Sequence, residues 1–105
     1  MNVMSVVKFK VQEGYEDVFI QALKSHDHSN KLWHRTVSLG NNEFLTINEY
    51  ANSDNESSID LITKDEEPGV KFLDSVEHML EFFEEGRTQP SSGLVVFFHK
   101  SMNKI

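Results

Sequence analysis

The chain has 105 residues, of which 17 are acidic and 10 basic, giving a formal net charge of -7. This length predicts a single domain over residues 1–105, and the unclustered cations argue against nucleic-acid or anionic-membrane partners. The absence of cysteine excludes disulfides, thiolate metal sites and a cysteine nucleophile. Because neither a leader nor an apolar run of about 20 residues is recognisable, we expect a cytoplasmic protein.

The N-terminal part has the patterns of a strand followed by a helix. Apolar side chains alternate with others from Val3 to Val11, which predicts a strand, and Gly14 ends it. The next apolar residues follow helical spacing, namely Tyr15, Val18, Phe19, Ala22 and Leu23. They predict an amphipathic helix of about three turns.

A β-hairpin is predicted next. Its strands cover Leu32–Leu39 and Phe44–Tyr50, and Gly40-Asn41-Asn42 between them tolerates the positive φ of a tight turn. Because successive residues of a strand point to opposite faces, Trp33 and His34 lie on different faces.

The second half of the chain predicts two helices and a strand. A weak capping pattern predicts a short helix over Ile59–Lys64, and Pro68-Gly69 should interrupt or kink the helical region. A longer amphipathic helix is expected over Val70–Glu85, with Gly86 as its C-terminal stop.

Gly93–Lys100 is predicted as the last strand. Residues 94–98 of it are all apolar, which indicates burial on both faces. The order β-α-β-β-α-β then predicts an α+β, ferredoxin-like fold with a four-stranded antiparallel sheet. Helices on one face would leave an apolar sheet face bare, so we expect a homodimer packed sheet to sheet.

These patterns resemble the dimeric α/β-barrel superfamily, in particular antibiotic-biosynthesis-monooxygenase-like proteins. The resemblance spans nearly the whole chain and is carried by Val6–Val11, Gly14, Glu16, Phe44–Tyr50 and Leu94–Phe98. It implies a homodimer with a pocket between the helices and the sheet of each protomer. Some members oxidise quinol-like or polyketide aromatics without a cofactor, some bind and degrade haem, and many have no assigned activity.

The haem-degrading members differ from this chain at the residues they use. Those members have an Asn early in the first strand, whereas Asn2 precedes the predicted strand here. The third strand ends in Glu49-Tyr50 where relatives often have a Trp, and residues 59–64 lack the His that relatives often carry. We therefore expect no haem, no other cofactor and no metal.

His34 is the predicted catalytic residue. If its strand face points towards the helices, the imidazole can act as general base for a phenolic proton. The alternative is a partly buried, hydrogen-bonded structural histidine. Asn48 and Tyr50 are predicted to hydrogen-bond a substrate oxygen, although Asn48 could instead pair with a neighbouring strand.

Three further residues are predicted to bind substrate. Trp33 is a candidate for stacking on an aromatic ring, with the core or dimer interface as the alternative, and Phe19 and Leu80 are candidates for the apolar wall. His26 and His28 could chelate a metal only with a third ligand, so a solvated loop is preferred. His78 and His99 are expected at the surface or rim.

The sequence thus predicts a small cofactor-independent monooxygenase-like protein. Its ligand would be a small apolar, aromatic or quinol-like molecule in a helix–sheet pocket. The alternative is a non-catalytic ligand-binding or regulatory homodimer of the same fold.

Overall fold

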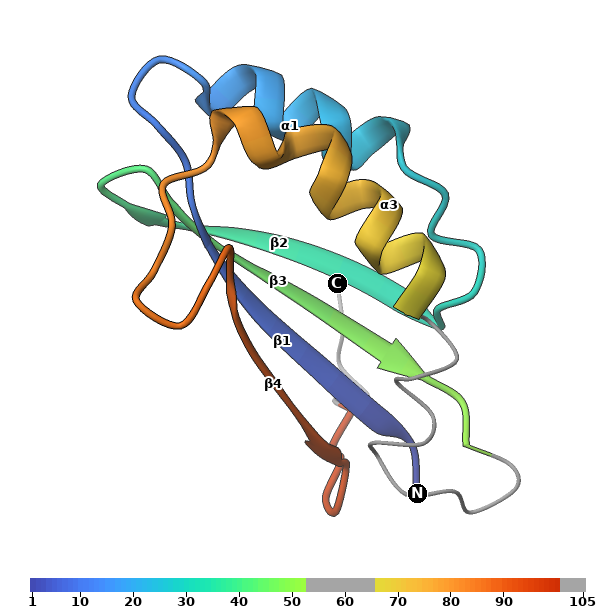
Figure 1. Cartoon of the computed structure of the whole chain (residues 1–105). Coiled ribbons are helices and arrows are strands. Elements are labelled where there is room, and N and C mark those ends of the chain that lie inside the picture. Colours follow the sequence, from blue (N-terminus) through green and yellow to red (C-terminus); the bar gives the residue numbers. More distant parts are fainter. Residues whose placement is uncertain (53–65, 101–105) are drawn as a thin grey trace.

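The computed structural model describes residues 1–52 and 66–100, which form a four-stranded antiparallel sheet with helices on one face (Figure 1). The elements are β1 (Val3–Lys10), α1 (Glu16–Ser25), β2 (Trp33–Gly40), β3 (Glu43–Tyr50), α3 (Glu66–Val76), the 3-10 helix η1 (Glu77–Met79) and β4 (Gln89–Leu94). The strand order β2-β3-β1-β4 confirms the predicted α+β, ferredoxin-like fold. The predicted helix Ile59–Lys64 lies outside the described residues. None of the described helices has the length and apolarity needed to cross a bilayer.

The N-terminal half folds as its sequence patterns predict. Along β3, buried and half-buried residues alternate, so that Phe44 and Asn48 face the helices. The hairpin between β2 and β3 turns at Gly40, Asn41 and Asn42, all three of which have positive φ. This alternation fixes an inner face of the sheet, towards the helices, and an outer face.

One apolar core joins the helices to the inner face near the hairpin. Its buried members are Phe9, Val11, Phe19, Leu23, Phe44, Val76, Met79 and Leu80. The Phe19 ring lies at its centre, 5.1 Å from the Phe9 ring and 5.2 Å from the Phe44 ring between centroids. This end of the helix–sheet layer is therefore filled by aromatic side chains.

The second long helix begins and ends earlier than predicted. Pro68 falls in the first turn of α3, where a missing N–H breaks no helical hydrogen bond, so Pro68-Gly69 does not interrupt the helix. The expected extension to Glu85 is wrong, because residues after η1 pair with the end of β1. Leu80 bridges Val11, and the Glu81 amide donates to the Lys10 carbonyl at 2.7 Å.

Gly86 is consequently not a helix stop. It closes a tight loop with Phe83, in which each residue donates its amide to the other's carbonyl. Its φ of 148° is a conformation that side chains disfavour, which is why glycine suits this position.

The last strand also differs from the prediction. It covers Gln89–Leu94 rather than Gly93–Lys100, and pairs with β1 from Lys8↔Gln89 to Val3↔Leu94. The ladder with β1 ends with the bond from the Val95 amide to the Asn2 carbonyl, because β1 begins at Val3. Pro90 is tolerated because β4 is an edge strand.

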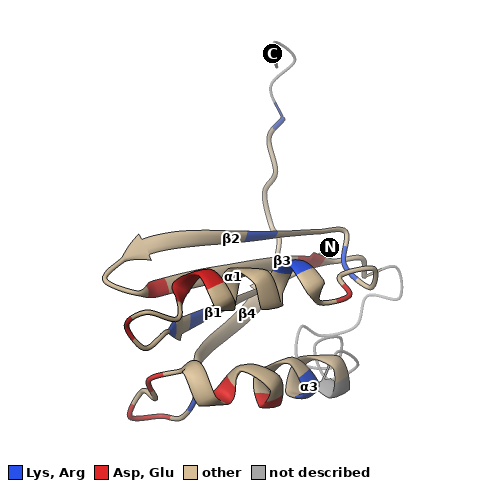
Figure 2. Ribbon diagram, turned by 90° about the horizontal axis from the view of Figure 1, so that it is seen from above, with Lys and Arg blue, Asp and Glu red and all other residues tan. Residues whose placement is uncertain are grey.

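The apolar run after β4 is exposed, which corrects the expectation that it is buried on both faces. Val96, Phe97 and Phe98 are 82%, 81% and 76% exposed. They belong to a segment without regular secondary structure that runs away from the sheet and helices (Figure 2). The outer face of the sheet also carries apolar side chains, with Val37 and Leu39 exposed.

Candidate functional site

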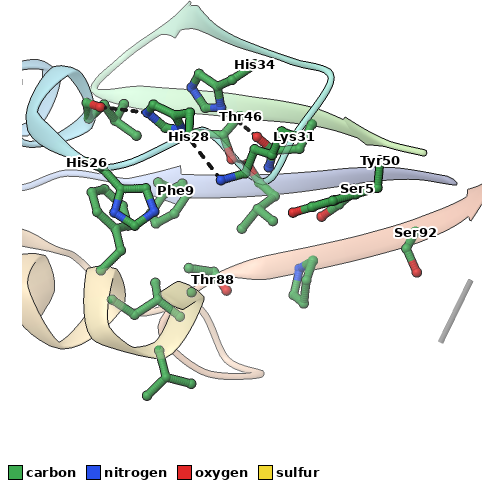
Figure 3. Close-up of a pocket in the computed structure, with 18 residues that line it drawn as sticks. Ser5, Phe9, His26, His28, Lys31, His34, Thr46, Tyr50, Thr88 and Ser92 are labelled. Carbon is green, nitrogen blue, oxygen red and sulfur yellow. Dashed lines mark hydrogen bonds between the residues drawn. The ribbon is translucent and has the colours of Figure 1, made fainter. Parts of the chain in front are cut away.

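A cavity of about 520 Å³ lies between the inner face of the sheet and the helices (Figure 3). Its lining comprises Ser5, Val7, Phe9, Leu23, His26, His28, Lys31, His34, Thr46, Asn48, Tyr50, Gly69, Val70, Phe72, Leu73, Thr88, Pro90 and Ser92. It forms because the inner face changes character along its strands. Phe9 and Phe44 fill the hairpin end, whereas Ser5, Thr46 and Asn48 leave room at the other end.

His34 projects from β2 onto the inner face and is held on both ring nitrogens. Nδ1 lies 2.6 Å from Oδ1 of Asn48, its cross-strand neighbour, and Nε2 lies 2.7 Å from the Thr36 hydroxyl oxygen. Since an amide oxygen only accepts, Nδ1 carries the proton and donates it to Asn48. In the neutral ring Nε2 then accepts from Thr36 and is the basic nitrogen.

The surroundings of His34 favour this neutral form. Burial lowers the pKa of His34 below its usual 6.5, and the nearby His28 and Lys31 act in the same direction, while the bond to Asn48 opposes them. A neutral imidazole at physiological pH is the form that a general base requires.

The loop after α1 brings two further histidines to the cavity. An Asx turn, in which the Ser29 amide donates to Asp27 Oδ1 at 2.9 Å, shapes this loop. The His28 ring stacks on the His34 ring, with centroids 4.3 Å apart, and the His26 ring packs against Phe72 at 5.1 Å. The loop thus forms one wall of the site.

His28 also connects Lys31 to the end of α1. Its Nε2 lies 2.8 Å from the Leu23 carbonyl oxygen, so Nε2 carries the proton and donates it. Nδ1 is left as an acceptor and lies 3.5 Å from Lys31 Nζ (Figure 3). Both ring nitrogens of His28 are thus engaged in this conformation, and residues 1–52 and 66–100 contain no group of three suitable metal ligands.

The cavity collects three of the predicted site residues. His34, Asn48 and Tyr50 all line it, because they share the inward phase of their strands. The catalytic role of His34 and the substrate contacts of the other two residues stay predictions.

The other three residues predicted to bind substrate lie outside the lining. Trp33 neighbours His34 and therefore points to the outer face, where its Nε1 donates to Glu49 Oε1 at 3.0 Å and Arg35 lies over its ring. Phe19 and Leu80 are buried in the core at the hairpin end instead.

Sequence reasoning missed His28 and Lys31 as residues of the cavity. The loop that carries them joins α1 to β2, and both of these elements contribute residues to the cavity lining. This connection could have indicated that the loop lies beside the cavity. Nothing local in the sequence showed that the loop folds back over His34, because that requires the bond from His28 to Leu23.

Comparison with solved structures identifies the fold. A candidate antibiotic biosynthesis monooxygenase from Chloroflexus aurantiacus superposes with a TM-score of 0.65 at 9% identity, over 95% of this chain and 98% of that one. A NIPSNAP family protein from Agrobacterium tumefaciens gives 0.58 at 10% identity, covering 93% and 96%. The Agrobacterium protein Atu4242 gives 0.57 at 12% identity, covering 95% and 99%.

At these identities the similarity concerns the fold alone. The chain shares the ferredoxin-like α+β fold of antibiotic-biosynthesis-monooxygenase-like proteins, as the sequence resemblance implied, and also that of NIPSNAP proteins. No family model and no curated protein matches the sequence.

Proposed function

We propose that the chain is a cofactor-independent, monooxygenase-like enzyme that binds a small aromatic or quinol-like compound in the cavity. The observation that carries the proposal is the geometry of His34. Asn48 fixes the proton on Nδ1, which leaves Nε2 as the basic nitrogen of a neutral ring in an otherwise largely apolar cavity.

The proposed reaction begins with proton transfer. A ligand hydroxyl, or an acidic CH₂ between aromatic rings, takes the place of the Thr36 hydroxyl as donor to His34 Nε2. The resulting anion gives electrons to dioxygen. A CH₂ between aromatic rings and O₂ become a carbonyl group and water, whereas a quinol gives two electrons and two protons to O₂ and leaves as a quinone with hydrogen peroxide as the second product. Among the cavity residues, Asn48 keeps the His34 ring oriented, and the apolar side chains of Phe72 and Val7 exclude water from the anion.

Asn48 can also contact the substrate. Its Oδ1 accepts from His34, so the donor end of the same amide, Nδ2, is separate from the group that orients the ring. This amide can therefore donate to a ligand oxygen while the histidine remains oriented.

The proposal includes a homodimer formed through the outer face of the sheet. A hollow of about 320 Å³ on this face is lined by Met4 and Val6 together with residues 91–97, so the sheet and the exposed apolar segment form one continuous surface. Such a surface is typical of a face that another protein covers. A second copy of the chain would cover this surface in a two-fold symmetric dimer, because each copy contributes the same apolar patch.

Oxygen consumption tests the enzymatic proposal. With naphthohydroquinones and anthrones as substrates, and spontaneous oxidation subtracted, His34→Ala should lower the rate about 10²-fold or more. His78→Ala is the matched control, because His78 is exposed and outside the cavity lining, and it should retain the wild-type rate.

Two results would contradict the enzymatic proposal. One is an unchanged rate in a folded His34→Ala protein. The other is saturable ligand binding without turnover of any substrate, which would establish the alternative of a non-catalytic ligand-binding protein.

A further inference from the structure

A row of polar side chains crosses the whole sheet on its inner face. His34 on β2 is the cross-strand neighbour of Asn48 on β3, and Asn48 is the neighbour of Ser5 on β1. Ser5 in turn lies opposite Ser92 on β4, and all four residues line the cavity. The first two residues have roles in the proposed reaction, whereas the two serines have none there.

Ser5 is an unusual residue for its position in the strand. It lies between Val3 and Val7 on the inner face of β1 and is only 8% exposed. Valine would suit such a position better, because it has a higher β propensity and buries apolar surface. A buried hydroxyl group needs hydrogen-bonding partners, and a ligand oxygen in the cavity would be one.

The row also determines how far apart the polar contacts of a ligand would be. Adjacent strands of a sheet are about 4.8 Å apart, so the backbones of His34 and Ser5, two strands apart, are separated by about 10 Å. Figure 3 shows Ser5 and Ser92 on neighbouring strands, with Phe9 towards the other end of the cavity. A flat fused-ring ligand can therefore have one oxygen at His34 and another at the serines, at opposite ends of its long axis.

We propose that Ser5, together with Ser92, determines ligand specificity by hydrogen-bonding a second ligand oxygen. The cavity would then select neutral fused-ring compounds that carry an oxygen group at each end of the long axis. A serine hydroxyl can donate to a carbonyl and accept from a hydroxyl, so the pair can bind both the reduced and the oxidised form of such a group. This inference rests on the proposed function in placing the first oxygen at His34, but it concerns binding and not turnover.

Calorimetric titration under nitrogen with two ligands tests the proposal. In 2,6-dihydroxynaphthalene each end of the fused rings carries a hydroxyl, whereas 2-naphthol has only one. The wild-type protein should bind the diol about fivefold more tightly or better, because the second hydroxyl gains a hydrogen bond. Burial in an apolar cavity alone would give the reverse order, since the second hydroxyl must lose its water.

The variants remove the serine hydroxyls one at a time. In Ser5→Ala the two ligands should bind within about twofold of each other, while the affinity for 2-naphthol stays within about twofold of wild type. Ser92→Ala should lower the preference for the diol in the same direction. Ser91→Ala is the matched control and should retain the preference, because Ser91 is exposed, pairs with Val6 and lies outside the cavity lining.

Three results would overturn the proposal. They are equal binding of the two ligands by the wild type, failure of both to bind, and an unchanged preference in both Ser5→Ala and Ser92→Ala. Selective binding of the diol without oxygen uptake would refute the enzymatic proposal and leave this one intact.

Discussion

The two faces of the sheet differ in a way that is unusual for a small protein with one helical layer. The inner face, which the helices cover, has polar residues such as His34, Asn48 and Ser5 at one end. The outer face has Val6 and Ile47 as cross-strand neighbours and no helix over it among the described residues. Polar groups in a covered layer suit a ligand, and apolar groups on an open face suit a protein partner.

The largest expected effect follows from placing a charge on the outer face. Val6→Glu would bury an unpaired carboxylate in the proposed dimer interface, at a cost of several kcal/mol. We expect a shift from dimer to monomer, measured by light scattering at micromolar concentration. The control is Gln21→Glu. Gln21 is an exposed residue of α1, so the substitution adds the same charge away from the outer face and should leave the dimer intact.

A monodisperse wild-type monomer would refute the role assigned to the outer face. So would a Val6→Glu protein that remains a dimer with unchanged affinity. In either case the inner cavity would be unaffected, because Val6 does not line it.

A smaller effect is expected from the residue that positions His34. Asn48→Ala removes the acceptor for Nδ1, and we expect oxygen uptake to fall about tenfold. The bond to Asn48 raises the pKa of His34, so the acid limb of the pH–rate profile should move to lower pH. Asn48→Asp keeps an acceptor and adds negative charge, so it should restore activity and move this limb to higher pH.

A purely structural role for Asn48 would change the rate without moving the pH profile. The direction of the shift therefore distinguishes positioning from general destabilisation. Thermal unfolding of both variants checks that they are folded.

The smallest expected effect is on how the free energy of unfolding depends on pH. The pKa of His34 is lower in the folded protein than its usual 6.5, so the unfolded chain binds more protons between these two values. The stabilising contribution is complete above about pH 6.5 and is lost as the pH falls towards the folded pKa. His34→Gln should flatten the decline in urea-unfolding free energy between about pH 7.5 and 5.

His78→Gln is the control for this measurement and should retain the wild-type decline. An identical decline in His34→Gln and wild type would show that the inner face does not disfavour the charged imidazole. The sign matters, because a histidine paired with a carboxylate would give the opposite slope.

The sequence predicts the residues that share a face of the sheet, because strand alternation is a local pattern. It does not predict element bounds that depend on pairing with a distant strand. Alternation placed His34 and Trp33 on opposite faces of their strand, but left open which face is turned to the helices. Cross-strand pairing with Asn48 decides this for His34. The end of α3 and the bounds of β4 depend on pairing with β1, which is distant in the chain. Polar residues 89–93 form a strand, and apolar Phe97 does not, because β1 offers partners only to the former.

The candidate site shows the same limit. His34, Asn48 and Tyr50 follow from strand phase, whereas His28 and Lys31 depend on how a loop folds against the sheet. That arrangement requires one hydrogen bond, from His28 to the Leu23 carbonyl, which no periodicity encodes.

NMR mapping of 2,6-dihydroxynaphthalene binding tests most directly whether the inner face is the ligand site. The ring signals of His34 and His28 should shift on titration, and the indole N–H of Trp33, the only tryptophan, should not, because it lies on the outer face. Shifts centred on Trp33 and Val37, or a titration that leaves His34 unchanged, would contradict the account.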